Sequence, residues 1–287
     1  MHARSRPLLL VIPARLQSQR LPRKMLLAET GRPLIEHTWR AAAAAVPGAD
    51  LVVVTDSDEI AAAVRRFGGR AEMTSPEAPS GTARIVEALP RLPAADVIVN
   101  IQGDEPEIAP DAVQAAVALL DRCPSAGMAT LVTPLRSEAD LANPSVVKAE
   151  LTPWREPQPR GILPGPAVED AWRAITFSRA AVPAAREWSD SLLRAQPPLY
   201  WQHVGLYAFR RAILEGWDDL PPSRLATLES LEQLRVVEAG IAIAAAAVDH
   251  PTRGIDTPAD YAAFVGRQAA FVGCQQAVAT QPAAPHG

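Results

Sequence analysis

The sequence predicts an α/β protein built on a mixed, mainly parallel sheet flanked by helices. In the first half of the chain, apolar runs of strand length alternate with segments of helical pattern. This alternation is typical of β-α-β units. The runs at 8–12 and 97–101 are apolar at nearly every position, as expected for strands buried on both faces. Hydrophobic residues make up 48% of the chain and charged residues 21%, which is the composition of a soluble, folded protein.

The elements of the first half have clear local signals. Gly68 and Gly69 follow the second helical pattern and end it. The strand at 97–101 runs directly into Gln102-Gly103-Asp104. The expected strands are 8–12, 51–55, 70–73 and 97–101, and the expected helices are 33–45, 57–67, 82–89 and 110–120.

The second half is less regular. The segment 149–171 is rich in proline and glycine and predicts a loop. Thr257 and Pro258 are suited to the cap and first turn of a closing helix. The expected strands are 128–132, 200–209 and 241–248, and the expected helices are 225–239 and 256–268. We expect a single domain over 1–270, with a smaller mixed lobe at about 128–239, and a disordered tail at 275–287.

Charge and composition exclude several functional classes. The net charge is −4, so the chain as a whole does not present a nucleic-acid-binding surface. No run approaches the roughly 18 apolar residues of a membrane span, and the apolar run near the N-terminus is too short for a signal peptide. Cys123 and Cys274 lie far apart, in no metal-ligand spacing. We therefore expect reduced thiols in a cytoplasmic protein.

A cluster of positive charge directly follows the first expected strand. Arg15, Arg20, Arg23 and Lys24 fall within ten residues of one another. Ligands of open parallel sheets bind at the carboxyl ends of the strands, and guanidinium and ammonium groups there suit phosphate. The segment predicts a phosphate-binding loop; the alternative is a solvated basic loop.

Two aspartates are placed to bind a metal ion. Asp104 follows a buried strand, and Asp256 lies between the last expected strand and the closing helix. Mg²⁺ in proteins is held by one or two carboxylates together with substrate phosphates. The pair predicts a magnesium site that faces the basic loop. Taken singly, Asp104 could cap a turn and Asp256 a helix.

Polar residues at two further places are candidates for ligand contacts. Ser80 and Arg84 lie at the start of a helix, where hydroxyls and free amides can bind anions or a base edge, although an ordinary cap is an equal alternative. His203 and Tyr207 are four apart on an expected strand, so both face one side of the sheet. With Arg179 they would suit a sugar acid; the alternative is that both belong to the core.

The chain lacks the sequence signatures of several other enzyme classes. No Gly-x-Ser-x-Gly elbow, P-loop or Gly-x-Gly-x-x-Gly fingerprint is present. This argues against a hydrolase, a P-loop kinase and a dehydrogenase.

From residue 8 to residue 261 the chain resembles the 3-deoxy-manno-octulosonate cytidylyltransferases, the CMP-Kdo synthetases, where Kdo is 3-deoxy-D-manno-octulosonate. The most specific match is the run Gln-Gly-Asp-Glu-Pro at 102–106. The other matching segments, all in order, are 12–24, 55–56, 73–74, 80–84, 99–101, 128–130, 143–148, 177–179, 203–207, 231–235 and 254–258.

The resemblance implies a nucleotide-diphospho-sugar transferase-like fold and a CTP-dependent reaction that serves lipopolysaccharide biosynthesis. The anomeric hydroxyl of Kdo would attack the α-phosphate of CTP, giving CMP-Kdo and pyrophosphate. The implied partners are CTP, Kdo and a second copy in a homodimer, with Mg²⁺ as cofactor. The implied catalytic residues are Arg15, Lys24 and Asp104; the nucleotide-binding residues are Ala14, Arg15, Arg20, Lys24, Ser80, Arg84 and Gln102; the sugar-binding residues are Arg179, His203, Tyr207, Glu232 and Gln233; and the metal ligands are Asp104 and Asp256.

The chain departs from the family pattern at several positions. Arg23 replaces a glycine, and we expect its φ to be negative with the side chain toward solvent or the γ-phosphate. Met25, Ala83 and Ala226 replace a proline and two acidic residues, and the segment 151–171 is long and proline-rich. Two alternatives therefore stay open: a cytidylyltransferase for a related acid sugar, such as sialic acid or an amino-Kdo, and a nucleotide-binding regulator without catalysis.

Overall fold

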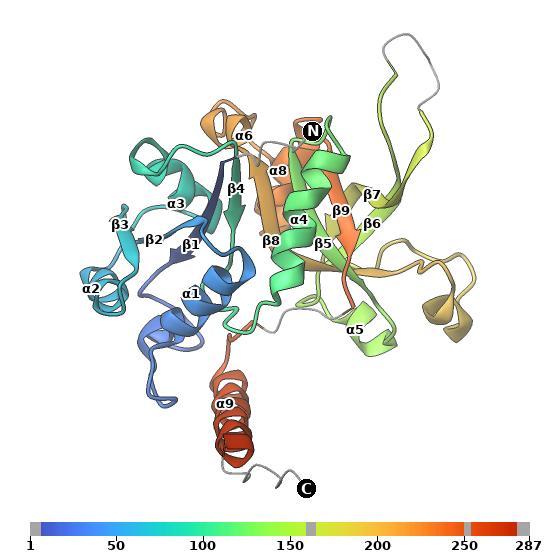
Figure 1. Ribbon diagram of the computed structural model, residues 1–287. Coiled ribbons are helices and arrows are strands. Elements are labelled where there is room, and N and C mark those ends of the chain that lie inside the picture. The colour runs from blue at the N-terminus through green and yellow to red at the C-terminus, as the bar shows by residue number, and fades with distance from the viewer. Residues whose placement is uncertain (1–6, 159–164, 250–253, 280–287) are drawn as a thin grey trace, which may run out of the picture.

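The computed structural model describes residues 7–158, 165–249 and 254–279, with side chains up to residue 271. The described strands form one nine-stranded sheet in the order β3-β2-β1-β4-β8-β5-β9-β7-β6, with helices packed on both faces (Figure 1). The strands are β1 (Leu8–Ala14), β2 (Asp50–Thr55), β3 (Arg70–Met73), β4 (Val97–Asn100), β5 (Met128–Pro134), β6 (Lys148–Arg155), β7 (Ala167–Ser178), β8 (Trp201–Arg210) and β9 (Ile243–Ala247).

The sheet is parallel on one side and mixed on the other. Strands β1 to β4 pair only in parallel with one another, whereas β8 is antiparallel to both β4 and β5. Strand β9 returns parallel to β5, and β6 and β7 form an antiparallel pair at the edge. The predicted α/β class with a mixed, mainly parallel sheet is confirmed. Strands β5 to β8, from the segment predicted as a smaller lobe, are continuous with the rest of the sheet.

The two faces of the sheet have separate apolar cores. Side chains of β1 alternate between them: Leu10 and Ile12 pack on one face, and Leu9 and Val11 on the other. The first face is covered by α1, α2 and α4, and the second by α3, α6 and α8. The described helices are α1 (Leu34–Ala45), α2 (Asp58–Arg66), α3 (Gly81–Ala88), α4 (Pro110–Arg122), α5 (Glu138–Ala142), α6 (Arg211–Glu215), α7 (Arg224–Glu229), α8 (Gln233–Glu238) and α9 (Pro258–Ala279), with short 3-10 turns at Lys24–Leu26, Leu89–Arg91 and Asp190–Arg194.

Every element predicted in the first half of the chain is present within a few residues of its expected limits. In the second half, the prediction of a loop over 149–171 is wrong for 149–155 and 167–171, which belong to β6 and β7, and residues 159–164 lie outside the described part of the chain. Pro153 lies inside β6, and an edge strand tolerates proline because it has fewer ladder hydrogen bonds to complete. Proline content was therefore a misleading signal.

The predicted helix over 225–239 is also wrong as a single element. Ser230 has a left-handed backbone, with φ of 51°, which ends α7 and separates it from α8. Leu228 is exposed, whereas Leu231 and Leu234 are buried. The regularly spaced apolar residues of this segment therefore belong to two separate helices and do not form one continuous buried face.

The closing helix begins as predicted and runs further. The Thr257 hydroxyl accepts the N–H of Asp260, whose carboxylate accepts the N–H of Thr257 in return. This reciprocal cap fixes the start of α9. The helix extends to Ala279, so the predicted disorder is wrong for 275–279, and residues 280–287 lie outside the described part of the chain.

Two sequence-based expectations about thiols and membranes can be compared with the fold. Cys123 is a free and buried cysteine, and burial raises the pKa of its thiol to about 11, so it is unreactive. The Cys274 side chain lies outside the described residues. None of the described helices combines the length and apolarity that a membrane crossing requires.

Candidate active site

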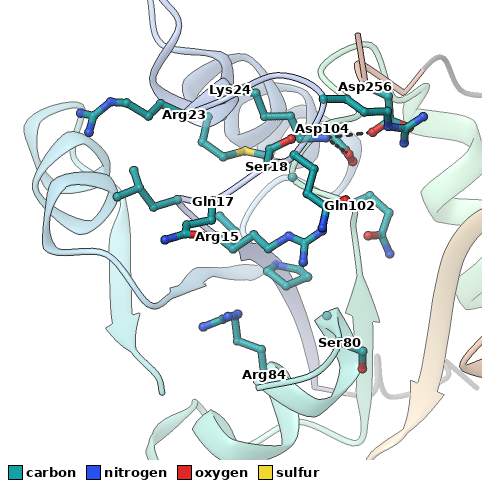
Figure 2. A pocket seen from close by; sticks show the side chains of 18 of the residues that line it. Arg15, Gln17, Ser18, Arg23, Lys24, Ser80, Arg84, Gln102, Asp104 and Asp256 are labelled. Atoms are coloured by element: carbon teal, nitrogen blue, oxygen red, sulfur yellow. Dashed lines mark hydrogen bonds and ion pairs between the residues drawn. The ribbon is translucent and has the colours of Figure 1, made fainter. Parts of the chain in front are cut away.

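A cavity of about 810 Å³ lies where β1 and β4 end side by side. These strands are parallel, so the loops that follow their carboxyl ends meet at one edge of the sheet. The lining comes from four segments: the basic loop after β1, the start of α3, the loop after β4, and Asp256 (Figure 2). All seven residues predicted to bind nucleotide line it: Ala14, Arg15, Arg20, Lys24, Ser80, Arg84 and Gln102.

The two predicted metal ligands meet at one edge of this cavity. The N–H of Ile255 donates to the carbonyl of Asp104, which joins the loop after β4 to the loop before α9. Asp104 and Asp256 consequently approach the same side chain, the ammonium of Lys24 (Figure 2).

Lys24 is held by three oxygens and is nearly buried. Its Nζ lies 2.5 Å from Asp104 Oδ2, 3.1 Å from Asp256 Oδ1 and 2.9 Å from the carbonyl of Ile255. Arg20 adds a second positive charge, 2.8 Å from Asp256 Oδ2. Two carboxylates that share one cation, with hard oxygen donors, fit the requirements of Mg²⁺, which takes its remaining ligands from water and phosphate.

Arg84 is buried at the opposite side of the cavity and is fixed by several acceptors. Nη2 donates to Asp56 Oδ2 at 3.0 Å, and Nη1 donates to the hydroxyl of Thr74 and the carbonyl of Ser75. Asp56 also accepts the N–H of Leu16 on Oδ1 at 3.1 Å. Asp56 therefore connects Arg84 to the basic loop.

Asp56 received no role from the sequence. It follows β2 directly, and the rule that singled out Asp104, a carboxylate at a strand end, applies equally to it. Ser80 was assigned two alternatives, and its hydroxyl caps α3 by accepting the N–H of Ala83 at 3.1 Å, while the residue also lines the cavity.

Arg23 does not adopt the expected backbone conformation. Its φ is 56° and its ψ 26°, so the predicted negative φ is wrong. The side chain is exposed, as expected, and the two terminal guanidinium nitrogens, Nη1 and Nη2, donate to the Glu59 carboxylate on α2. In Figure 2 it points away from the Lys24–Asp104 pair. The loop therefore keeps the left-handed turn that a glycine would favour, and the chain accommodates an arginine in it.

The five predicted sugar-binding residues lie beyond this cavity, around β8, α7 and α8. Gln102 connects the two regions through a hydrogen bond of 3.4 Å to the carbonyl of Gly205 on β8. The His203 and Tyr207 rings stack with centroids 5.5 Å apart, which confirms that they share one face of the strand. Burial raises the pKa of Tyr207, so its hydroxyl is neutral and donates to Gln233 Oε1 at 3.2 Å.

In this second region, one acceptor oxygen and one donor nitrogen are buried without a hydrogen bond. Thr82 donates to Glu232 Oε1 at 2.6 Å. Glu232 Oε2 and Gln233 Nε2 are buried and have no hydrogen-bond partner among the described residues. Buried polar atoms without partners are rare in proteins, so these two atoms are available to an ordered water or a bound ligand.

Arg179 is fixed by backbone oxygens. Its Nε donates to the carbonyl of Glu229 at 2.6 Å, and Nη1 donates to the carbonyl of Pro144 at 3.0 Å. The Glu229 carboxylate accepts in return from the N–H of Arg179 and the hydroxyl of Ser178. A guanidinium has five N–H donors, so this network orients Arg179 without using all of them. Glu229, whose carboxylate holds Arg179, had no role predicted from its sequence context.

Comparisons with known proteins show which family the chain resembles along its length. A family model described as Cytidylyltransferase matches residues 9–243. A 3-deoxy-manno-octulosonate cytidylyltransferase from Rhodopirellula baltica is 42% identical over 260 residues, covering 90% of this chain and 97% of the relative. The protein of the same name from Bradyrhizobium sp. is 44% identical over 256 residues, covering 88% and 94%.

Two solved structures are also similar. The structure of CMP:2-keto-3-deoxy-manno-octonic acid synthetase complexed with CTP has a TM-score of 0.76 at 36% identity, covering 92% of this chain and 98% of that chain. A nucleotidyl transferase from Methanothermobacter has a TM-score of 0.54 at 15% identity, over the same shares, and supports the fold alone.

Proposed function

The chain belongs to the cytidylyltransferase family, and we propose that it transfers the cytidylyl group of CTP to Kdo, releasing pyrophosphate. The observation that carries this proposal is the cavity in which Lys24 lies between Asp104 and Asp256 beside a basic loop. Relatives that are more than 40% identical along most of their length are named for this activity. The product, CMP-Kdo, would serve lipopolysaccharide biosynthesis.

Nucleotidyl transfer requires charge neutralisation and in-line positioning more than covalent catalysis. Arg15, Arg20 and Lys24 would bind the triphosphate, because fixed positive groups there oppose its negative charge. Ala14, Ser80 and Arg84 would contact cytosine, and Gln102 would lie between the nucleotide and the sugar. Arg15, Lys24 and Asp104 are the residues we assign to catalysis.

Asp104 and Asp256 would hold Mg²⁺, and the fit of their oxygens to a shared cation supports this assignment. When bound, Mg²⁺ supplies charge neutralisation at the phosphates and polarises the reacting phosphoryl group. Lys24 would then turn its ammonium toward phosphate oxygens.

The sugar would bind in the second region, around β8. His203, Tyr207, Glu232 and Gln233 offer acceptors and donors to hydroxyls, and Arg179 offers N–H groups to the carboxylate. The unpartnered atoms of Glu232 and Gln233 support this placement. We further propose that the protein acts as a homodimer in the cytoplasm.

A pyrophosphate-release assay tests the function. Each of four nucleoside triphosphates is combined with Kdo, an amino-Kdo and sialic acid, with and without Mg²⁺. We expect turnover with CTP and Kdo only when Mg²⁺ is present. Equal turnover with UTP or ATP would overturn the cytosine assignment, and faster turnover with another acid sugar would overturn the choice of Kdo.

A further inference from the structure

Thr130 on β5 contacts an irregular part of β8. The two strands shift register there: Thr130 lies opposite Tyr207, whereas the next residue, Leu131, lies opposite Val204. The Thr130 hydroxyl is completely buried and lies 3.2 Å from the carbonyl of Val204 and 2.9 Å from the carbonyl of Leu206. Its third neighbour is His203 Nε2, at 3.0 Å.

These three contacts determine which atom carries the proton on His203. A hydroxyl has one proton, and carbonyl oxygens accept but never donate. Donation of the Thr130 proton to one carbonyl leaves a single carbonyl facing the hydroxyl's lone pairs, whereas donation to His203 would leave two, so donation to a carbonyl is favoured. The Thr130 oxygen then accepts from His203, so the proton of the neutral ring is on Nε2. The remaining ring nitrogen, Nδ1, is an acceptor.

The ring is held so that this arrangement persists. The Phe177 ring meets the His203 ring edge-on at 4.8 Å, and Tyr207 stacks on it at 5.5 Å. Burial lowers the pKa of His203 to about 3, so the ring stays neutral near pH 7. In the described part of the chain, the only hydrogen bond of the ring is the one to Thr130.

We propose that Thr130 is a positioning residue that holds His203 in the Nε2–H tautomer, so that Nδ1 accepts a hydrogen bond from a hydroxyl of the acid sugar. This inference rests on the proposed function for its ligand. A hydroxyl can donate to Nδ1, whereas an ionised carboxylate has only lone pairs to offer and is repelled. His203 would thus select the hydroxyl side of the sugar and direct the carboxylate toward Arg179.

Nitrogen NMR of the full chain tests the tautomer without any substrate. The chain has five histidines, and His203→Gln identifies the signal of interest. We expect the wild-type His203 ring to show a protonated Nε2 and an unprotonated Nδ1 at pH 7. Thr130→Ser should keep this pattern, and Thr130→Val should lose it or mix the two tautomers. A wild-type ring protonated on Nδ1 would overturn the proposal.

Kinetics test the consequence for the sugar. Thr130→Val should raise the KM for Kdo by about tenfold, with the KM for CTP and kcat little changed, because only one hydrogen bond to the sugar is weakened. Thr130→Ser should restore the wild-type value. Thr133→Val is the matched control, since Thr133 is buried in the same strand and, among the described residues, its hydroxyl has one hydrogen bond, to the carbonyl of Asp249.

Two outcomes would contradict the inference: an unchanged KM for Kdo in Thr130→Val, or an equal rise in Thr133→Val. Failure of the proposed function looks different, because the wild type itself would then fail to use Kdo while the NMR pattern could still be read.

Discussion

The ammonium of Lys24 lies 2.5 Å from Oδ2 of Asp104, although the two residues belong to loops that follow different strands. The Lys24 side chain is only 9% exposed, so this is a largely desolvated contact rather than a surface ion pair. Asp256 completes the group from a third segment of the chain. The positive loop and the two acidic loops therefore form one electrostatic unit before any nucleotide binds.

Asp104→Asn and Asp256→Asn should each reduce kcat by about 100-fold or more. Either change removes a carboxylate that we assign to Mg²⁺, and stabilisation of transition-state charge by a metal is worth several kcal/mol. Pyrophosphate release measured against Mg²⁺ concentration checks this. Asp218→Asn, at an exposed residue outside the cavity, is the control. Near-normal turnover of either variant at saturating Mg²⁺ would exclude that residue from the metal site.

Asp56→Asn should weaken the binding of CTP by about tenfold and leave the KM for Kdo nearly unchanged. Both carboxylate oxygens of Asp56 accept hydrogen bonds, one from Leu16 and one from Arg84. The asparagine would replace one of these oxygens with an NH₂ group, which cannot accept, so one of the two hydrogen bonds would be lost. Calorimetric titration with CTP measures the effect, and Asp58→Asn, exposed in the next turn, is the matched control. If the folded variant bound CTP like the wild type, Asp56 would not position Arg84.

Arg23→Gly should change kcat/KM by less than tenfold and leave Tm nearly unchanged. Glycine relieves the left-handed backbone, while the exposed pair with Glu59 is lost, and the two effects oppose each other. Glu59→Gln removes the pair but keeps the backbone strain, so it should lower Tm more than Arg23→Gly does. A wild type without detectable pyrophosphate release that Arg23→Gly rescued would show instead that Arg23 blocks the phosphate path.

His203 should make the protein less stable as the pH falls below about 6.5. The unfolded chain binds a proton near the ordinary pKa of 6.5, whereas the folded ring does not until about 3. The contribution of the neutral ring to the free energy of unfolding is therefore fully present above pH 6.5. It is lost as the pH falls toward 3, by up to about 1.4 kcal/mol per pH unit. Urea unfolding of wild type and His203→Gln at pH 7.5, 6.5, 5.5 and 4.5 measures it. If the difference in free energy of unfolding between the two proteins were the same at all four pH values, the burial of a neutral His203 ring would be contradicted.

Local patterns were sufficient for the parallel half of the sheet. Strands such as β1 and β4 are apolar on both faces, and helices such as α2 have a polar cap at Ser57, so each signal lies within its own segment. Strands β6 and β7, at one end of the sheet, were not predictable in this way. They pair mainly with each other and only over two residue pairs each with β8 and β9, so neither is an apolar run of the buried kind, and β6, as the last strand, tolerates Pro153.

The candidate site shows the same division. By itself the sequence determined which residue types follow which strands, and hence that a basic loop and two aspartates belong to the edge of the sheet where the parallel strands end. Only the tertiary structure decided that Lys24 bridges Asp104 and Asp256, that Asp56 connects Arg84 to the basic loop, and that Thr130 orients His203. The reason is physical: residue type and short-range periodicity are properties of a segment. Ion pairs, a buried arginine's partners and a histidine tautomer depend on distances of about 3 Å between segments, which packing and strand register alone bring about.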